Sequence, residues 1–305
     1  MASRPTRFYS RTMVVAVGLA GAGRRAAEVY ARALSSCDAV GFAGVWARGV
    51  DRGRSLAEQH GVPFYATFDE LLEHCDAVAF ALPPPAQPVY AVPAIRRGKA
   101  ALLEMPIGGD LAGAEELDEA ATVAHAVTQV ALTWRYAAAV RAFLGGDVPQ
   151  ARPFGGRGQV VSGAFADTRT GSPSRHERGV LMSRGPHLVD LLDAALGPVA
   201  GERAHGDPHG WLGLELEHQG GRASHASMSG DVPVPSERAS VEVYGPGGHA
   251  EVDCAAAVGA DTYLTMIQEF AEAVVRGNSH ELDVHRGMHL QRVLEAAETD
   301  LLMGI

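Results

Sequence analysis

Lysine is almost absent from this chain, and so is any excess of positive charge. Of the 26 basic residues, Lys99 is the only lysine, and the others are arginines. A mechanism that needs an amine side chain must use Lys99 or do without one. The basic residues face 36 acidic ones, for a net charge of −10. This balance argues against a surface built to bind nucleic acid or an anionic membrane, although a local basic pocket can still hold a phosphate.

Cysteines and long apolar runs are also scarce. The three cysteines, Cys37, Cys75 and Cys254, lie far apart and form no Cys-x-x-Cys pair, so we expect a reduced, cytoplasmic protein. No run approaches the ~18 apolar residues that a membrane span needs. The apolar stretch over 13–19 follows basic residues, as in a signal peptide. It turns directly into a glycine loop without a cleavage pattern.

The first 128 residues alternate strand-like and helix-like segments. Apolar strands are expected at 13–19, 39–47, 76–82 and 100–104, with amphipathic helices between them and a helix at 112–126. Near-continuous apolar strands separated by helices predict βαβ units on a parallel sheet. We therefore expect an α/β fold with an N-terminal Rossmann dinucleotide-binding domain over residues 1–128.

The second half has a different pattern. A strand at 130–134 opens it, followed by a helix and a connector rich in glycine and proline. Residues 211–218 alternate leucines with glycine or glutamate, and 239–245 and 249–254 alternate in the same way, which predicts an open, largely antiparallel sheet with one wetter face. With helices near 186–196, 262–276 and 285–303, residues 129–305 are expected to form an α+β domain for substrate binding and oligomerisation.

The segment after the first strand contains Gly21-x-Gly23-x-x-Ala26 between a strand and a helix. The first glycine permits a tight turn, the second lets the backbone approach a pyrophosphate, and the small third residue lets the helix pack closely. Amides at the start of the helix bind anionic oxygens. The pattern predicts nucleotide binding, although glycines also occur in ordinary strand-to-helix turns.

The end of the second strand favours NADP(H) over NAD(H). An acidic residue there would bind the ribose 2′-hydroxyl of NAD, but this chain has Ala47 followed by Arg48. An arginine can pair with a 2′-phosphate. Arg52 and Arg54 would add weakly to such a pocket, and a merely solvated Arg48 is the alternative.

Together these segments resemble the Gfo/Idh/MocA oxidoreductase family, and the resemblance covers essentially the whole chain. It is carried by "GAGRRA", "DAVAFALPPP", "IRRGKAALLEMPIGG", "RGVLMSRGPHLVDLL" and "VEVYGPGGHAEVD". The resemblance implies hydride transfer between a nicotinamide and a sugar, polyol or related carbonyl compound. It also implies a homo-oligomer, a dimer or tetramer, formed through the open sheet. The residues expected at the cofactor are those of the glycine turn and of the following strand ends: Gly21, Ala22, Gly23, Arg24, Arg25, Arg48, Leu82, Pro83, Pro84, Glu104 and Met105.

The sequence departs from the family at the end of the fourth strand. Members typically carry Glu-Lys-Pro there, whereas this chain has Glu104-Met105-Pro106. Methionine cannot hold a charge or exchange a proton. Lys99 lies at the opposite end of the strand, roughly 20 Å away at ~3.3 Å per residue. The resemblance therefore implies that the usual lysine-assisted alcohol oxidation is lost, with Met105 an apolar wall beside the nicotinamide and Pro106 following a cis bond. Gln87 is a smaller change, near where a histidine often follows the prolines.

A second departure lies at residues 183–187, where members commonly show Asp-x-Gly-x-His. Here Ser183 replaces the aspartate and the histidine, His187, remains. Pro186 suits the first turn of a helix, so we expect His187 near a helix N-terminus, where the dipole favours its neutral form and Asp190 opposes that effect. His187 is thus the leading catalytic candidate, able to protonate a substrate near neutral pH, unless it simply forms a hydrogen bond between the domains.

The remaining candidates are weaker. Tyr136 is a second catalytic candidate, and a core tyrosine is the alternative. Four residues are expected at the substrate: Arg135, Ser183, Arg184 and His176. Arg135 either binds an anion or braces the domains. Arg184 would favour a carboxylated substrate. His176 lies in the polar loop 166–179, which either closes over the substrate or, for most of its length, is simply solvated. His205 and His209 have metal-like spacing but no further ligands, so no metal is expected.

Two functions follow. The first is an NADP-dependent reductase that acts on an imine, an activated C=C bond or a carbonyl of a small molecule, with a proton from His187, Tyr136 or water. The composition, rich in arginine and alanine, suggests a GC-rich genome, and biosynthesis in specialised metabolism is a hypothesis that goes beyond the composition. The second is a non-redox enzyme (cyclase, isomerase or lyase) or a pseudoenzyme, with NADP structural or absent.

Overall fold

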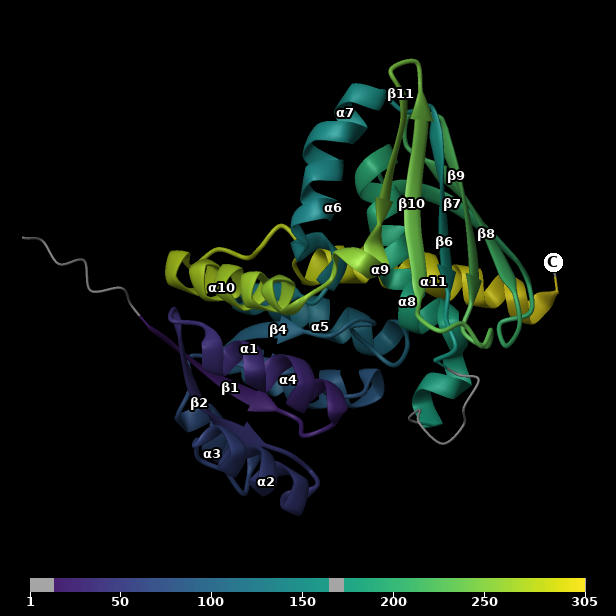
Figure 1. Ribbon diagram of the computed structural model, residues 1–305. Helices are drawn as coiled ribbons and strands as arrows, with labels where there is room; N and C mark the ends of the chain where they lie inside the picture. The colour runs from purple at the N-terminus through teal and green to yellow at the C-terminus, as the bar shows by residue number, and fades with distance from the viewer. Residues whose placement is uncertain (1–13, 165–172, 305) are drawn as a thin grey trace, which may run out of the picture.

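The computed structural model describes residues 14–164 and 173–304, and of residues 173–178 the backbone alone (Figure 1). The described residues form two sheets. The first is the predicted parallel sheet, with order β2-β1-β3-β4-β5. Its strands are β1 (Val15–Ala20), β2 (Val40–Trp46), β3 (Ala77–Phe80), β4 (Ala100–Leu103) and β5 (Thr128–Val130). The middle strands β3 and β4 are buried along their whole length, as near-continuous apolar runs predict.

Helical segments connect these strands. They are η1 (Ala26–Tyr30), α1 (Ala31–Ser36), α2 (Val50–His60), α3 (Phe68–Glu73), η2 (Pro84–Ala86), α4 (Gln87–Arg96) and α5 (Leu111–Ala124). Local chemistry sets several of their ends. Gly61 ends α2 with a φ of 65°, and Asp110 caps α5 by accepting a hydrogen bond of 2.8 Å from the amide of Gly113. Thr67 and Glu70 form a capping box at α3.

The second sheet has the order β11-β10-β6-β9-β8-β7 and is antiparallel except between β6 and β9. Its strands are β6 (Gly155–Val161), β7 (Val199–Gly206), β8 (Leu212–His218), β9 (Arg222–Ser229), β10 (Arg238–Gly245) and β11 (Gly248–Asp253). Helices α8 (Pro173–Leu196) and α11 (Val284–Met303) lie along one face (Figure 1). On β8 the leucines are buried and Glu215 and Glu217 are exposed, which confirms the expected wetter face.

Short helical segments join the two sheets, and α10 (Ala260–Arg276) returns from the second half to pack against α1 (Figure 1). The short segments are η3 (Thr133–Tyr136), α6 (Ala138–Ala142), η4 (Phe143–Asp147), α7 (Val148–Ala151) and α9 (Cys254–Ala257). Helix α11 also packs against α5. The two C-terminal helices therefore tie the second half to the first sheet.

Two expected elements differ from the structure. The strand expected at 130–134 is instead β5, over residues 128–130, which pairs with β4 at the edge of the first sheet, while residues 133–136 form η3. All three residues of β5, the polar Thr128 and Gln129 included, are buried there. The helix expected from residue 186 begins earlier. Helix α8 runs through Pro186, and its only non-helical residue is Gly179, with φ 61° and ψ −160°. The proline therefore does not mark the start of the helix. The break in α8 is at Gly179, because glycine tolerates a positive φ.

Candidate active site

The turn after β1 has the geometry that the glycine fingerprint requires. Gly21 has a φ of +126°, and a Cβ there would lie 2.4 Å from the carbonyl oxygen of Ala81, so only glycine fits. A Cβ on Gly23 would meet no atom of the described residues within 4 Å. The continuous helix over 24–36 starts directly afterwards, and Ala26 is fully buried. The turn thus leaves its second glycine open to an approaching group, while Ala22 and Arg24 flank it at partly and fully exposed positions.

The end of β2 is arginine-rich and exposed. Ala47 is buried, whereas Arg48 is exposed and has no hydrogen bond or ion pair among the described residues. Arg52 is also exposed, and its guanidinium nitrogens lie 3.3 Å from where a Cβ of Gly49 would stand. Arg54 instead lies over the ring of Phe64, 5.4 Å from its centre. Two of the three arginines are therefore available to an anion at this strand end.

The prolines after β3 lie at the same sheet edge. Leu82 is buried, Pro83 is exposed, and Pro84 begins η2. The carboxyl ends of β1 to β4 thus meet beside the glycine turn, the usual ligand position of an open parallel sheet.

Glu104, at the end of β4, is tied to the helix of the glycine turn. Arg25 Nε and Tyr30 Oη both donate to Glu104 Oε1, the tyrosine at 2.7 Å. Tyr30 is fully buried, and the side chain of Glu104 is 12% exposed. Burial alone would lower the pKa of Arg25, but Glu104 and Tyr30 raise it above its usual range. Burial and Glu104 raise the pKa of Tyr30. Sequence reasoning placed Arg25 at the cofactor and missed this ion pair.

Gln87 holds the backbone around Met105. Its side-chain amide donates to the carbonyls of Glu104 (3.0 Å) and Ile107 (2.9 Å), and its side-chain oxygen accepts from the amide of Glu104 (2.8 Å). Gln87 is fully buried. The peptide bond between Met105 and Pro106 is cis, as expected, and Met105 is partly buried against the core. A glutamine can satisfy donors and acceptors together, which explains this residue type here.

His187 lies on α8, with its ring 5.3 Å from that of Trp134. The residue is 8% exposed, and its Nδ1 has no hydrogen-bond partner within the described part of the chain. Burial, Arg25 and Arg184 lower the pKa of His187 to about 3. This neutral form does not favour the expected role of protonating a substrate near neutral pH. The neutral form of His187 was expected from the dipole of a helix N-terminus. His187 instead lies well inside α8, and its neutral form results from burial beside two arginines.

Tyr136 and Arg135 are both engaged within the protein. Tyr136 is 1% exposed, and its hydroxyl donates to the carbonyl of Val130 at 3.0 Å, which gives it the core role weighed as the alternative. Arg135 Nη1 lies 3.3 Å from both carboxylate oxygens of Asp190, and its Nη2 donates to Glu281. Asp190 and Glu281 both lie in residues 129–305, as Arg135 does, so these ion pairs act within the second half and do not brace the two domains. Asp190 is engaged by arginines and does not raise the pKa of His187 as expected.

Arg184 pairs with Glu237, with Nε at 2.7 Å from the carboxylate. Its charge is therefore matched, which removes the reason to expect a carboxylated substrate. Ser183 Oγ is 3.5 Å from the carbonyl oxygen of Val180, one turn earlier on α8. The side chain of His176 and residues 166–172 of the expected loop lie outside the described residues, and residues 173–178, expected in the loop, form the start of α8 instead.

Lys99 is engaged at the start of β4. Lys99 Nζ donates to the carbonyl of Cys75 at 2.8 Å, at the start of β4 and far from Glu104. Among the described residues, no cluster of three or more histidine, cysteine, aspartate or glutamate side chains has the geometry of a metal site. In the same part of the chain, none of the helices is long and apolar enough to cross a bilayer.

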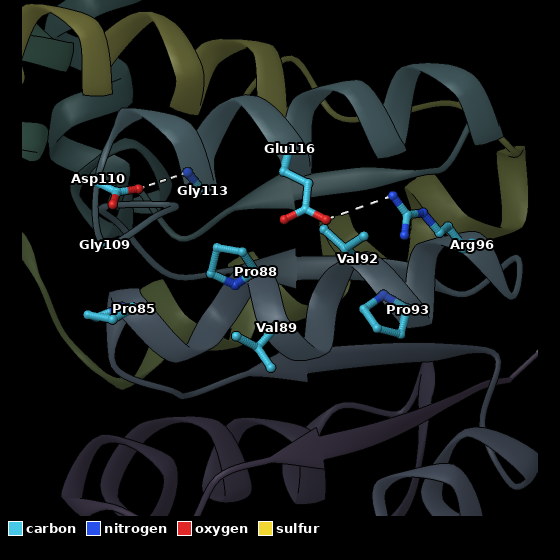
Figure 2. Close-up of a pocket in the computed structure, with 10 residues that line it drawn as sticks. All are labelled: Pro85, Pro88, Val89, Val92, Pro93, Arg96, Gly109, Asp110, Gly113 and Glu116. Atoms are coloured by element: carbon cyan, nitrogen blue, oxygen red, sulfur yellow. Dashed lines mark hydrogen bonds and ion pairs between the residues drawn. The ribbon is translucent and has the colours of Figure 1, made fainter.

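A surface groove lies elsewhere on the first domain, between α4 and α5 (Figure 2). It has a volume of about 410 Å³, and an ion pair of 3.8 Å between Arg96 and Glu116 stands at one end. Prolines and valines of α4 form its apolar wall, and Asp110 and Gly113 stand at the other end. None of the predicted site residues lines it, so it is separate from the strand-end site.

Comparison with known proteins agrees with this fold. Residues 15–132 match the profile of an oxidoreductase family with an NAD-binding Rossmann fold, GFO_IDH_MocA. No curated protein sequence is similar enough to count as a relative. Several solved structures superpose over nearly the whole chain.

One is GenD2 from gentamicin A biosynthesis in complex with NAD, with a TM-score of 0.83, 20% identity, and coverage of 100% of this chain and 98% of that chain. Another is a putative myo-inositol dehydrogenase from Sinorhizobium meliloti, with a TM-score of 0.84, 16% identity, and coverage of 96% and 98%. A third is an oxidoreductase from Agrobacterium radiobacter in complex with NAD+, L-tartaric acid and magnesium, with a TM-score of 0.83, 20% identity, and coverage of 95% and 97%. At these identities the likeness establishes the two-domain fold.

Proposed function

The chain belongs to the Gfo/Idh/MocA oxidoreductase family, and from that membership we propose that it is an NADP-dependent reductase of a small molecule in specialised metabolism. The observation that carries the cofactor choice is the end of β2, where a buried Ala47 precedes an exposed Arg48 without a partner among the described residues. A 2′-phosphate would supply that partner. The likeness to GenD2, a protein of gentamicin A biosynthesis, supports the metabolic setting.

The residues of the first sheet fit a dinucleotide. Gly23 and the start of the following helix would hold the pyrophosphate, Arg48 and Arg52 the 2′-phosphate, and Met105 would lie beside the nicotinamide. When bound, the reduced nicotinamide supplies a hydride to an electrophilic carbon. Because Met105 carries no proton and Lys99 is bound at the far end of β4, no lysine assists the reaction.

Neither of the expected proton donors supports that role. The neutral His187 holds no proton that it can release near neutral pH, and the hydroxyl of Tyr136 is bonded to Val130. Water is therefore the proposed source of the proton. This suits reduction of an imine, an activated C=C bond or a carbonyl, none of which requires an alcohol to be deprotonated.

The proposal includes association of two or more copies through the open face of the second sheet. That face is accessible on β8, where Glu215 and Glu217 are exposed, and on β10, where Tyr244 is 42% exposed.

The first test is a fluorescence titration with NADPH and NADH. The wild-type protein is expected to bind NADPH more tightly. Arg48→Ala should weaken NADPH binding by about tenfold, the scale of one charged hydrogen bond, and leave NADH binding unchanged. Arg32→Ala, an exposed arginine of α1, is the matched control. Equal affinity for both nucleotides would refute the NADP assignment.

Substitutions of Gly23 and Gly21 distinguish an effect on nucleotide binding from an effect on folding. Gly23→Ala adds a Cβ in open space, so it should fold normally yet bind either nucleotide at least tenfold more weakly, because the methyl group blocks the pyrophosphate. Gly21→Ala forces a contact of 2.4 Å with Ala81 and should lower the melting temperature as well. Normal nucleotide binding by Gly23→Ala would show that the turn is not the site. Binding of neither nucleotide by the wild-type protein would favour the non-redox alternative.

A further inference from the structure

One row of charged residues crosses the open face of the second sheet. The strand registers place its members side by side from β7 to β11, in the order Arg203, Glu215, His225, Arg157, Glu242 and Glu251. Residues at paired positions of neighbouring strands point to the same side of a sheet. Glu242 is partly exposed and the other five residues are exposed, so the row lies on the surface.

The charges of this row are antisymmetric about His225. On the two strands next to it stand Glu215 on one side and Arg157 on the other. One strand further out stand Arg203 and Glu242. Each position thus has the opposite charge at the same distance on the other side of β9. A row of this kind is complementary to its own reverse, and self-complementarity is what a two-fold interface between identical chains requires.

The direction of the two-fold axis decides whether the row meets its reverse. An axis parallel to the strands reverses the strand order of the copy, so each charge meets the row read backwards. An axis across the strands keeps the order and places Arg203 against Arg203 and Glu215 against Glu215, and like charges placed opposite each other are unfavourable. Packed sheets keep their strand directions within about 30° of each other, so long side chains that face each other stay within reach.

The charges also select the position of the axis. Three positions overlap five or six of the strands. With the axis at the centre of the sheet, between β9 and β6, Glu215 lies against Glu242 of the copy. With the axis on β6, Arg157 lies against its own counterpart and Glu215 against Glu251. Only the axis on β9 brings no like charges of this row together, because Arg203 then meets Glu242 and Glu215 meets Arg157.

The neighbouring row repeats this complementarity in size. On the same five strands it contains Gly201, Glu217, Ala223, Gly155 and Tyr244. Reversal about β9 places the exposed Tyr244 against Gly201 of the copy, and the exposed Glu217 against Gly155. A large side chain faces a glycine in both cases, which leaves room for the two sheets to approach each other.

We propose that the second sheet binds a second copy of this chain about a two-fold axis along β9, with Arg203 and Glu215 of each copy paired to Glu242 and Arg157 of the other. This inference rests on the proposed association through the open sheet and adds the orientation and the contacts of the two copies. Arg203 has no hydrogen bond or ion pair within the described residues, and Glu242 of the copy supplies a partner. Glu251, on the edge strand β11, lies outside the overlap.

The test is the dissociation constant of the dimer in charge-exchange variants, measured by sedimentation equilibrium. Arg203→Glu places two negative charges against each other at both ends of the interface and should raise the constant at least tenfold. Adding Glu242→Arg should restore the association. Within one chain these two residues are four strand spacings apart, roughly 19 Å, so restoration arises only between copies.

Arg203→Glu with Glu251→Arg is the matched control. It has the same net charge as Arg203→Glu with Glu242→Arg, and Glu251 is the next residue of the same row, but it faces no strand of the copy. This variant should stay dissociated. A second exchange tests the inner pair: Glu215→Arg alone should weaken the dimer at least tenfold, and adding Arg157→Glu should restore it.

The outcomes distinguish this inference from the proposed function. A dimer that Arg203→Glu leaves intact, or that neither exchange restores, would overturn the inference and leave the reductase standing. Restoration by Glu251→Arg would move the axis to the centre of the sheet and overturn the inference as well. A monomeric wild-type protein would refute both the inference and the proposed association. A dimer that follows the exchanges but binds no NADPH would support the inference and refute the reductase.

Discussion

His187 should make the protein less stable in mild acid. Its pKa is about 3 in the folded protein and 6.5 in its ordinary state. Between these values the unfolded chain binds a proton that the folded protein does not, so protonation favours unfolding as the pH falls. The free energy of unfolding should therefore decrease from about pH 6.5 downward. The cause is the cost of burying a positive imidazole next to Arg25 and Arg184.

The size of the effect at pH 5 follows from the distance to the ordinary pKa. That distance is 6.5 − 5, or about 1.5 pH units, and each unit corresponds to about 1.4 kcal/mol. His187 should thus lower the free energy of unfolding by about 2 kcal/mol between pH 7 and pH 5. Glu269, with a pKa of about 2, has an effect of the opposite kind: it stabilises the fold above about pH 4.5 and loses that contribution only below it. Glu269 therefore contributes little to the change in stability between pH 7 and pH 5.

Urea unfolding of the wild-type protein and of His187→Gln at pH 7 and pH 5 measures this effect. The glutamine variant has no proton to gain, so it should lose about 2 kcal/mol less than the wild-type protein between the two values. Burial also lowers the pKa of His218, but that residue is present in both proteins and its contribution cancels. Equal losses in the two proteins would refute the inference that His187 is buried in its neutral form.

Two further predictions concern stability. Gln87→Met leaves three buried backbone groups without partners and should lower the free energy of unfolding by about 3 kcal/mol. Urea unfolding measures this loss, with the exposed Gln59→Met as the control. A change below about 0.5 kcal/mol would contradict the role of Gln87 in holding the backbone around Met105. Arg286→Met leaves two buried carboxylates of α8 without their shared cation and should cost about 3–5 kcal/mol. Arg292→Met on the same helix is exposed and should cost almost nothing, so similar losses in both variants would contradict the role of the ion pairs.

The sequence predicts the first domain well because its signals are local. The apolar strands and the tight turn at Gly21 are each determined by neighbouring residues, and the structure confirms them. Helix α8 was placed less well because proline and glycine gave competing signals. The break is at Gly179, and Pro186 continues inside the helix.

The site was less predictable because it depends on residues distant in sequence. Glu104 is bound by Arg25, 79 positions earlier, and Arg135 is engaged by Asp190, 55 positions later. From the sequence alone, a charged side chain is interpreted as free to bind a ligand, because its partner within the protein is not known. The environment of His187 likewise comes from residues of both domains. No local pattern encodes these pairings, so the sequence gives candidate site residues but not their charge state or their contacts.

The position of β6 in the second sheet has a consequence for how the chain folds. This strand pairs with β9 and β10, which begin more than 60 residues later along the chain. Its partners therefore emerge from the ribosome after it, and β6 spends that interval as an unprotected strand that could join other chains. Strand β6 begins with Gly155, Gly156, Arg157 and Gly158, so three of its first four residues are glycines. Such a segment has little tendency to aggregate, so β6 can remain unpaired during synthesis and still occupy an inner position in the finished sheet.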